Sequence, residues 1–120
     1  MATAQITMRV CLTRKRISLS RSAVKFLGNP THLGFWYDES NRNLTFLPTA
    51  KDDIDAFEIP AHFWKGNKQS CEIARIAFLL ALQYRVGWEE KSRYAYNGVL
   101  EYTDGIPTIV FNLAFGTRLK

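Results

Sequence analysis

Residues 16–28 read RISLSRSAVKFLG, and this stretch decides the fold that the sequence predicts. Its first residues alternate between polar and apolar side chains, which is the period of a half-buried strand. Ser20 follows with the side chain of a helix N-cap, and Gly28 suits the left-handed position after a helix end. We therefore expect a strand that passes directly into a short helix over residues 21–27.

The segments on either side of this stretch predict further strands. Residues 6–12 alternate in the same way and are joined to it by the charged turn 13–15. Residues 34–37 and 44–47 predict a hairpin around the polar turn 39–43. The first half of the chain is therefore rich in strands and carries one short helix.

The second half repeats this order of elements. The helix is apolar nearly all round and is expected to be buried. The turn Asp104-Gly105 is typical of a two-residue type I′ hairpin. The predicted elements are, in order, an edge strand at 56–60, a loop at 62–69, a strand at 70–74, a helix at 75–86, and hairpin strands at 93–102 and 108–115.

A chain of 120 residues with 47% hydrophobic residues predicts one domain spanning residues 1–120. Residues 12–48 and 70–115 form a candidate internal repeat, joined by a polar connector. The predicted fold is β-rich α+β, in which two βαββ units form one compact barrel-like domain with one short and one longer helix. Chance similarity between the two halves is the alternative.

Positive charge is concentrated near the N-terminus. The first 37 residues contain six Lys or Arg and no Asp or Glu, whereas the whole chain has a net charge of +5. Such a field attracts polyanions. Nucleic acid, with DNA favoured, is the predicted partner, and an acidic protein is the alternative.

Residues 16–28 resemble the AbrB/MazE/SpoVT swapped-hairpin family of bacterial DNA-binding proteins. The family pattern is G-R-h-x-h-P, then a short basic helix that ends in L-G, then a hairpin. This sequence departs from the pattern at Leu12, Lys15 and Ser20. The resemblance covers about residues 12–48, and it implies that residues 70–115 are a degenerate second copy.

The resemblance implies transcription regulation in the cytoplasm, with a basic face that grips the DNA backbone. Arg16 and Lys25 match basic positions with which the family contacts DNA. Arg14, Lys15 and Arg21 add charge beside them. These five residues are the predicted nucleic-acid-binding set.

The main alternative is a protein-binding module without nucleic-acid contacts, of the kind that phages and mobile elements use to inhibit a host protein. Trp64 and Trp36 are its candidate anchors, since aromatic side chains are enriched among binding hot spots. In the run 35–37, the aromatic side chains either stack on unpaired bases or alternate into the core. A small enzyme or a binder of nucleotide-like signals is a third reading, for which the sequence supplies no catalytic motif.

We expect no cofactor and no metal site. His32, His62 and the two cysteines lack the paired spacing of zinc ligands. The acidic residues Asp52, Asp53, Asp55 and Glu58 indicate a solvated loop, with a divalent-cation site as the alternative.

Two cysteines favour a reduced, cytoplasmic protein, although a single Cys11–Cys71 bridge is the other possibility. No stretch has the length of a membrane span. The chain is expected to be either a monomer with internal pseudo-twofold symmetry or a homodimer.

Overall fold

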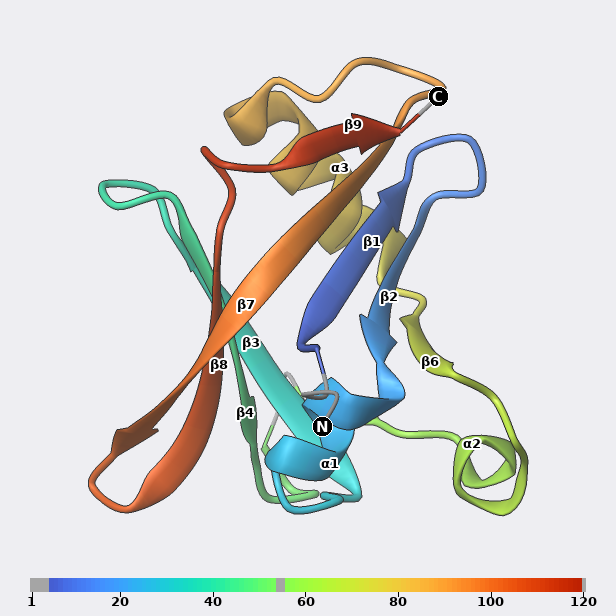
Figure 1. Cartoon of the computed structure of the whole chain (residues 1–120), viewed down its shortest axis with the longest axis vertical. Helices are drawn as coiled ribbons and strands as arrows, with labels where there is room; N and C mark the ends of the chain where they lie inside the picture. The colour runs from blue at the N-terminus through green and yellow to red at the C-terminus, as the bar shows by residue number, and fades with distance from the viewer. Residues whose placement is uncertain (1–4, 54–55, 120) are drawn as a thin grey trace.

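The computed structural model describes residues 5–53 and 56–119, which form a β-rich α+β fold of nine strands and three short helices (Figure 1). The strands in chain order are β1 (Thr7–Cys11), β2 (Arg16–Ser20), β3 (His32–Asp38), β4 (Asn43–Pro48), β5 (Phe57–Glu58), β6 (Ser70–Ile73), β7 (Arg93–Thr103), β8 (Ile106–Asn112) and β9 (Thr117–Leu119). The helices are α1 (Arg21–Phe26), α2 (Ala61–Lys65) and α3 (Ile76–Val86).

Eight of these strands form a nearly closed antiparallel barrel in the order β5-β3-β4-β8-β7-β1-β2-β6. The barrel stays open between β5 and β6, which do not pair with each other. The long strand β7 crosses the molecule diagonally in Figure 1 and connects two groups of strands. Its first residues pair with β1 and its last residues pair with β8, while β9 lies along its beginning.

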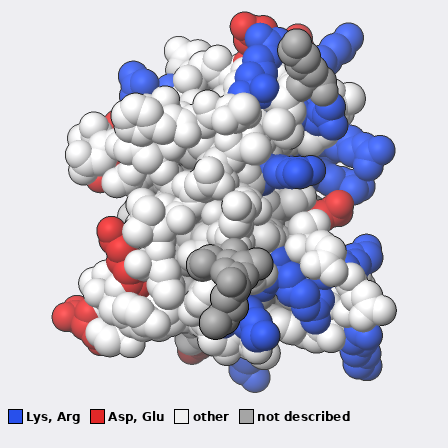
Figure 2. Space-filling view, viewed as in Figure 1, with Lys and Arg blue, Asp and Glu red and all other residues white. Residues whose placement is uncertain are grey.

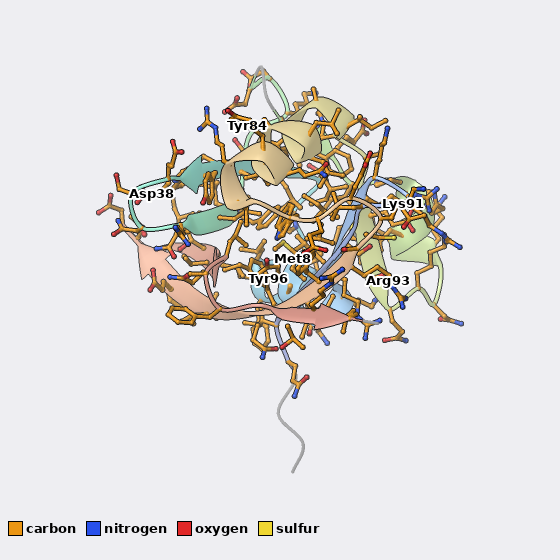
Figure 3. The ribbon with its side chains drawn as sticks, turned by 90° about the horizontal axis from the view of Figure 1, so that it is seen from above. Met8, Asp38, Tyr84, Lys91, Arg93 and Tyr96 are labelled. Carbon is orange, nitrogen blue, oxygen red and sulfur yellow. The ribbon has the colours of Figure 1, made fainter. Side chains whose placement is uncertain are left out.

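The interior is filled by one face of each strand. Met8 and Val10 of β1 have no exposed surface, and Phe46 and Phe111 meet edge to face with ring centres 5.9 Å apart. Seen from above, Met8 lies in the middle of the molecule beside Tyr96 (Figure 3). In β1, buried Met8 and Val10 alternate with exposed Arg9, and this alternation confirms the predicted strand period along residues 6–12.

Several local predictions are confirmed. The Ser20 hydroxyl accepts a hydrogen bond from the Ala23 amide at 3.3 Å, as an N-cap does. Gly28, after the helix, has a φ of +86°. The β7–β8 turn has φ values of 52° at Asp104 and 79° at Gly105, both left-handed as a type I′ turn requires.

Two predictions about helices are wrong. Residues 62–69 do not form only a loop, because α2 begins directly after Pro60 and inserts Phe63 into the core. The helix α3 has the predicted position but is not buried all round. It packs against the barrel by one side only, so Leu79 and Leu82 are buried whereas Ile76, Leu80 and Tyr84 are exposed.

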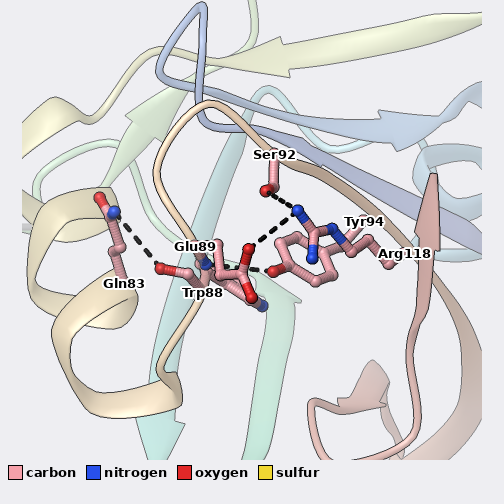
Figure 4. Close-up of polar contacts among 6 residues, drawn as sticks. All are labelled: Gln83, Trp88, Glu89, Ser92, Tyr94 and Arg118. Carbon is pink, nitrogen blue, oxygen red and sulfur yellow. Dashed lines mark hydrogen bonds and ion pairs between the residues drawn. The ribbon is translucent and has the colours of Figure 1, made fainter. Parts of the chain in front are cut away.

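The C-terminal segment is held by polar contacts that the sequence pattern does not reveal (Figure 4). Arg118 on β9 donates to the Ser92 hydroxyl at 3.0 Å and pairs with Glu89 at 2.9 Å. The Tyr94 hydroxyl accepts from the Glu89 amide at 3.1 Å. These contacts fix the loop before β7 and the strand β9 against each other.

Gly98 lies where β7 changes partners, and it allows three chain segments to approach closely. A Cβ atom here would lie 2.7 Å from Phe111 Cε1, 2.9 Å from Ile6 Cγ2 and 3.0 Å from Ile109 Cγ2. The Gly98 amide also donates to the Ile6 carbonyl at 2.8 Å. Glycine in a strand often marks such a close approach.

We predict that Gly98→Ala lowers the free energy of unfolding by about 1–3 kcal/mol, because the added methyl group overpacks the core. The neighbouring, exposed Asn97→Ala should change it by less than about 0.5 kcal/mol. Urea unfolding of both variants measures the difference. Equal effects from the two substitutions would show that the site has room for a side chain.

Candidate functional site

Four arginines line one shallow hollow on the outer face of the barrel. Arg9 comes from β1, Arg16 from β2, Arg93 from β7, and Arg14 from the turn between β1 and β2. The hollow has a volume of about 340 Å³, and Glu72 of β6 is its one carboxylate among the described residues. We call these four residues the arginine cluster.

Strand register brings the arginine cluster together. Cys11 of β1 pairs with Arg16 on one side and with Arg93 on the other. Arg9, two residues earlier, points to the same outer face, because successive side chains of a strand alternate between faces. The alternation that buries Met8 and Val10 therefore turns the arginine side chains toward solvent.

A second hollow continues the first along β2. Its volume is about 580 Å³, and the two hollows share Arg9 and Ser18. The second hollow is rich in hydroxyl groups, and its lining residues are Thr7, Arg9, Ser18, Ser20, Arg21, Ser22, Gln69 and Ser70. We call the two hollows together the basic trough.

The basic trough lies on the more positive side of the molecule. In Figure 2, Lys and Arg side chains follow the right edge from top to bottom, where β2, β6 and α2 lie, and Asp and Glu side chains occupy the lower left edge. Figure 3 shows the same separation from above, with Asp38 at one side and Lys91 and Arg93 at the other.

The five predicted nucleic-acid-binding residues do not form one group. Arg14 and Arg16 line the basic trough, and Arg16 also pairs with Glu72 at 3.0 Å. Lys15 is exposed at the tip of the β1–β2 turn with a φ of 54°, and it lines neither hollow. Arg21 and Lys25 lie on the helix α1, which starts at the opposite end of β2 from this turn.

Arg21 acts as a clamp between α1 and the segment that contains α2. Its guanidinium group donates to the backbone carbonyls of Phe63 and Lys68, each at 3.0 Å, and lies 4.7 Å from the centre of the Phe63 ring. Arg21 still borders the hydroxyl-rich hollow. Lys25 is exposed in the last turn of α1 and lines neither hollow.

Two arginines of the cluster were not among the predicted site residues. Arg9 occupies a polar position in the alternating strand 6–12, so the strand period already indicated that it faces outward. Arg93 is brought beside Cys11 only by the pairing of β1 with β7. Since these strands are far apart in the sequence, no local signal could have found that neighbour.

The two candidate anchor tryptophans differ in exposure. Trp64 is partly buried and packs against Phe63, with ring centres 5.0 Å apart. Trp36 is 49% exposed on the outer face of β3, while Phe35 and Tyr37 on the inner face pack against the core. Trp36 lines a third hollow, away from the arginine cluster.

The cysteines are free thiols on opposite faces of the sheet. Cys71 points into the core, where burial, with a smaller contribution from the Glu72 charge, raises the pKa of its thiol to about 11. Cys11 is half-buried and lines the arginine hollow.

The described residues contain no group of three His, Cys, Asp or Glu side chains placed to hold a metal ion. Asp52 and Asp53 are exposed in the turn after β4, and Asp55 lies outside the described residues. In the described part of the chain, no helix has the length and apolar character needed to cross a membrane.

Comparisons with protein-family models, with curated proteins and with solved structures find no match for this chain.

The contacts of Arg21 predict a structural role that Lys25 does not share. Arg21→Ala should lower the free energy of unfolding by about 2 kcal/mol, because two backbone carbonyls lose a charged donor. Lys25→Ala, on the same helix, should change it by less than about 0.5 kcal/mol. Thermal and urea unfolding compare the two variants. A Lys25 effect as large as that of Arg21 would contradict this assignment.

Proposed function

We propose that the protein binds the phosphate backbone of nucleic acid, with DNA favoured, through the basic trough. The observation that carries this proposal is the convergence of four arginines, from three strands and a turn, on one hollow that contains a single described carboxylate. Arginine is suited to this task because its planar fork of donors matches the oxygens of a phosphate group.

The dimensions of the basic trough support this reading. It follows the five residues of β2, which extend over about 16 Å. A DNA strand carries one phosphate for every ~3.4 Å of helix axis, and because the strand winds around that axis its consecutive phosphates lie farther apart than this, so about two or three fit along the trough. Ser18 and Ser70 make no hydrogen bond through their side chains to a described residue, and hydroxyl groups are common phosphate contacts.

We further propose that the barrel consists of two βαββ units, β2-α1-β3-β4 and β6-α3-β7-β8. Equivalent strands pair with each other across the molecule, β2 with β6 and β4 with β8, both antiparallel. Antiparallel pairing of equivalent strands is what a pseudo-twofold axis between them requires. This arrangement supports the resemblance to the AbrB/MazE/SpoVT family, with both units in one chain, and it favours a monomer.

The proposed activity in the cell is that of a small DNA-binding regulator. The contacts that the geometry offers are to phosphate, and phosphate contacts position a protein without reading base sequence. Regulation of particular genes would therefore need further contacts beside the trough.

We predict that neutralising the arginine cluster weakens binding to duplex DNA. Arg9→Gln and Arg14→Gln should each reduce affinity about tenfold and lower the slope of log affinity against log salt by about 1. Lys51→Gln, which removes an exposed charge outside the trough, should change affinity by less than about twofold. Fluorescence anisotropy at several salt concentrations measures both quantities. Affinity that does not vary with salt would contradict the proposal.

Removal of the Glu72 charge tests the same proposal through an expected increase in DNA affinity. Glu72→Gln should increase affinity for duplex DNA, because it removes the described carboxylate of the hollow and releases Arg16 from its ion pair. Glu90→Gln, at an exposed position in the loop before β7, is the matched control with the same change of net charge. If the two variants bind DNA equally, the trough is not the site of contact.

A protein-binding module without nucleic-acid contacts is the second candidate function. The observation that favours it is the row of exposed apolar side chains Ile76, Leu80 and Tyr84 on α3. Protein purified at low salt distinguishes the two. Nucleic acid that co-purifies with the protein and is removed by high salt supports the nucleic-acid-binding function. A protein partner that is lost in the Leu80→Glu variant but retained in the Arg9→Gln variant supports the protein-binding module.

A further inference from the structure

The third hollow lies on the outer face of the other half of the barrel, on β3, β4, β8 and the end of β7. It has a volume of about 340 Å³ and no Lys, Arg or His among its described lining residues. Its chemistry is therefore opposite to that of the basic trough, and the proposed function makes no use of it.

Strand register fixes the layout of this hollow. Trp36 of β3 pairs with Thr45 of β4, which pairs in turn with Val110 of β8. One step along, Thr108 of β8 pairs with Glu101 of β7. An aromatic side chain and a carboxylate thus lie on the outer strands of this face, with small β-branched residues on the two strands between them.

The floor of the hollow is formed by two threonines that have little exposed surface. Thr45 is 7% exposed and Thr108 is 5% exposed. The Thr108 hydroxyl donates to the Glu101 carbonyl at 3.2 Å, whereas the Thr45 hydroxyl makes no hydrogen bond to a described residue. Among the described residues, no fully buried side-chain nitrogen or oxygen lacks a hydrogen-bond partner, so the Thr45 oxygen is open to the hollow. The Thr45 hydroxyl is therefore available to a bound molecule.

The rim of the hollow carries uncompensated negative charge. Asp38 is engaged in the β3–β4 turn, where its carboxylate accepts from the Ser40 amide at 3.1 Å and from Asn41 Nδ2 at 2.8 Å. The carboxylates of Glu101 and Asp104 make no ion pair or hydrogen bond with a described residue. Together with the half-exposed ring of Trp36, they favour a cation and disfavour phosphate or carboxylate ligands.

We propose that this hollow binds a small organic cation, a guanidinium or ammonium group on a short apolar chain. The cation lies against the face of Trp36 within the negative field of Glu101 and Asp104, and the apolar chain covers Leu47 and Val110. The Thr45 hydroxyl accepts a hydrogen bond from the cation. The volume is at the lower end of the range of small-molecule sites, which fits a ligand of this size.

Butylguanidinium and butylurea test the proposal, because they have nearly the same shape and differ in charge. Titration is followed by the chemical shifts of the Trp36 indole N–H and the Thr45 and Thr108 amides. Saturable shifts with butylguanidinium over the millimolar range, and affinity for butylurea at least fivefold weaker, are expected. Equal affinity for the two compounds, or no saturable shift, would overturn the proposal.

Protein variants separate the aromatic and the electrostatic contributions. Trp36→Leu keeps an apolar side chain without a ring, and Glu101→Gln removes one charge. Each should weaken butylguanidinium binding about fivefold, followed at the remaining amides of the hollow. Glu90→Gln is the control and should leave affinity unchanged. An equal loss in Glu101→Gln and Glu90→Gln would show a general charge effect and refute the site.

A blocked Gly-Arg-Gly peptide distinguishes a free ligand from a side chain of another protein. Comparable or weaker binding than that of butylguanidinium supports the free cation. Binding at least tenfold tighter than that of butylguanidinium would overturn the assignment and identify the hollow as a docking point for an arginine of a partner. DNA binding by the basic trough is measured separately, so this test does not depend on its outcome.

Discussion

The insertion of β1 between β2 and β7 is the constraint on which the rest of the structure depends. All five of its residues pair with β7 and four of them also pair with β2. One strand therefore joins the N-terminal segment to β7, which begins 82 residues after β1 ends at Cys11. The apolar side chains Met8 and Val10 require burial, and their burial turns Arg9 outward. Burial of these two side chains therefore both holds the nearly closed barrel together and builds the charged face. The proposed binding chemistry of this face follows from strand period and register and does not need a dedicated loop.

The local elements could be predicted from the sequence because their signals are local. The alternation before Leu12, the cap at Ser20 and the left-handed turn at Asp104 depend on a few neighbouring residues. The partial closure of the barrel and the strand β9 depend on pairings between distant segments. The apolar sequence of α3 predicted burial, but the number of neighbours that a helix receives is set by the whole barrel. Short α2 was missed because Pro60 and Phe63 give only a weak helix signal.

The candidate site was predicted in part for the same reason. Charge content pointed to the N-terminal third, and Arg14 and Arg16 do line the basic trough. The five predicted residues are close in sequence but not in space, because β2 separates the β1–β2 turn from α1. The guanidinium group of Arg21 is also engaged by hydrogen bonds to backbone carbonyls. Arg93 could only be added once β7 was known to pair with β1. The charge count predicts a polyanionic partner, whereas the proposed contact surface depends on which strands are neighbours.

The hydrogen bonds of Arg21 also affect the seam between β5 and β6, where the barrel stays open. On this side β6 has no neighbouring strand among the described residues, and α2 with the following loop is the segment that connects the two edges. Free backbone edges invite pairing with another chain, which leads to aggregation. By tying Phe63 and Lys68 to α1, one arginine holds the connecting segment in place. The segment that spans the open side of the barrel is thus held by a residue whose charge alone would suggest only a ligand contact.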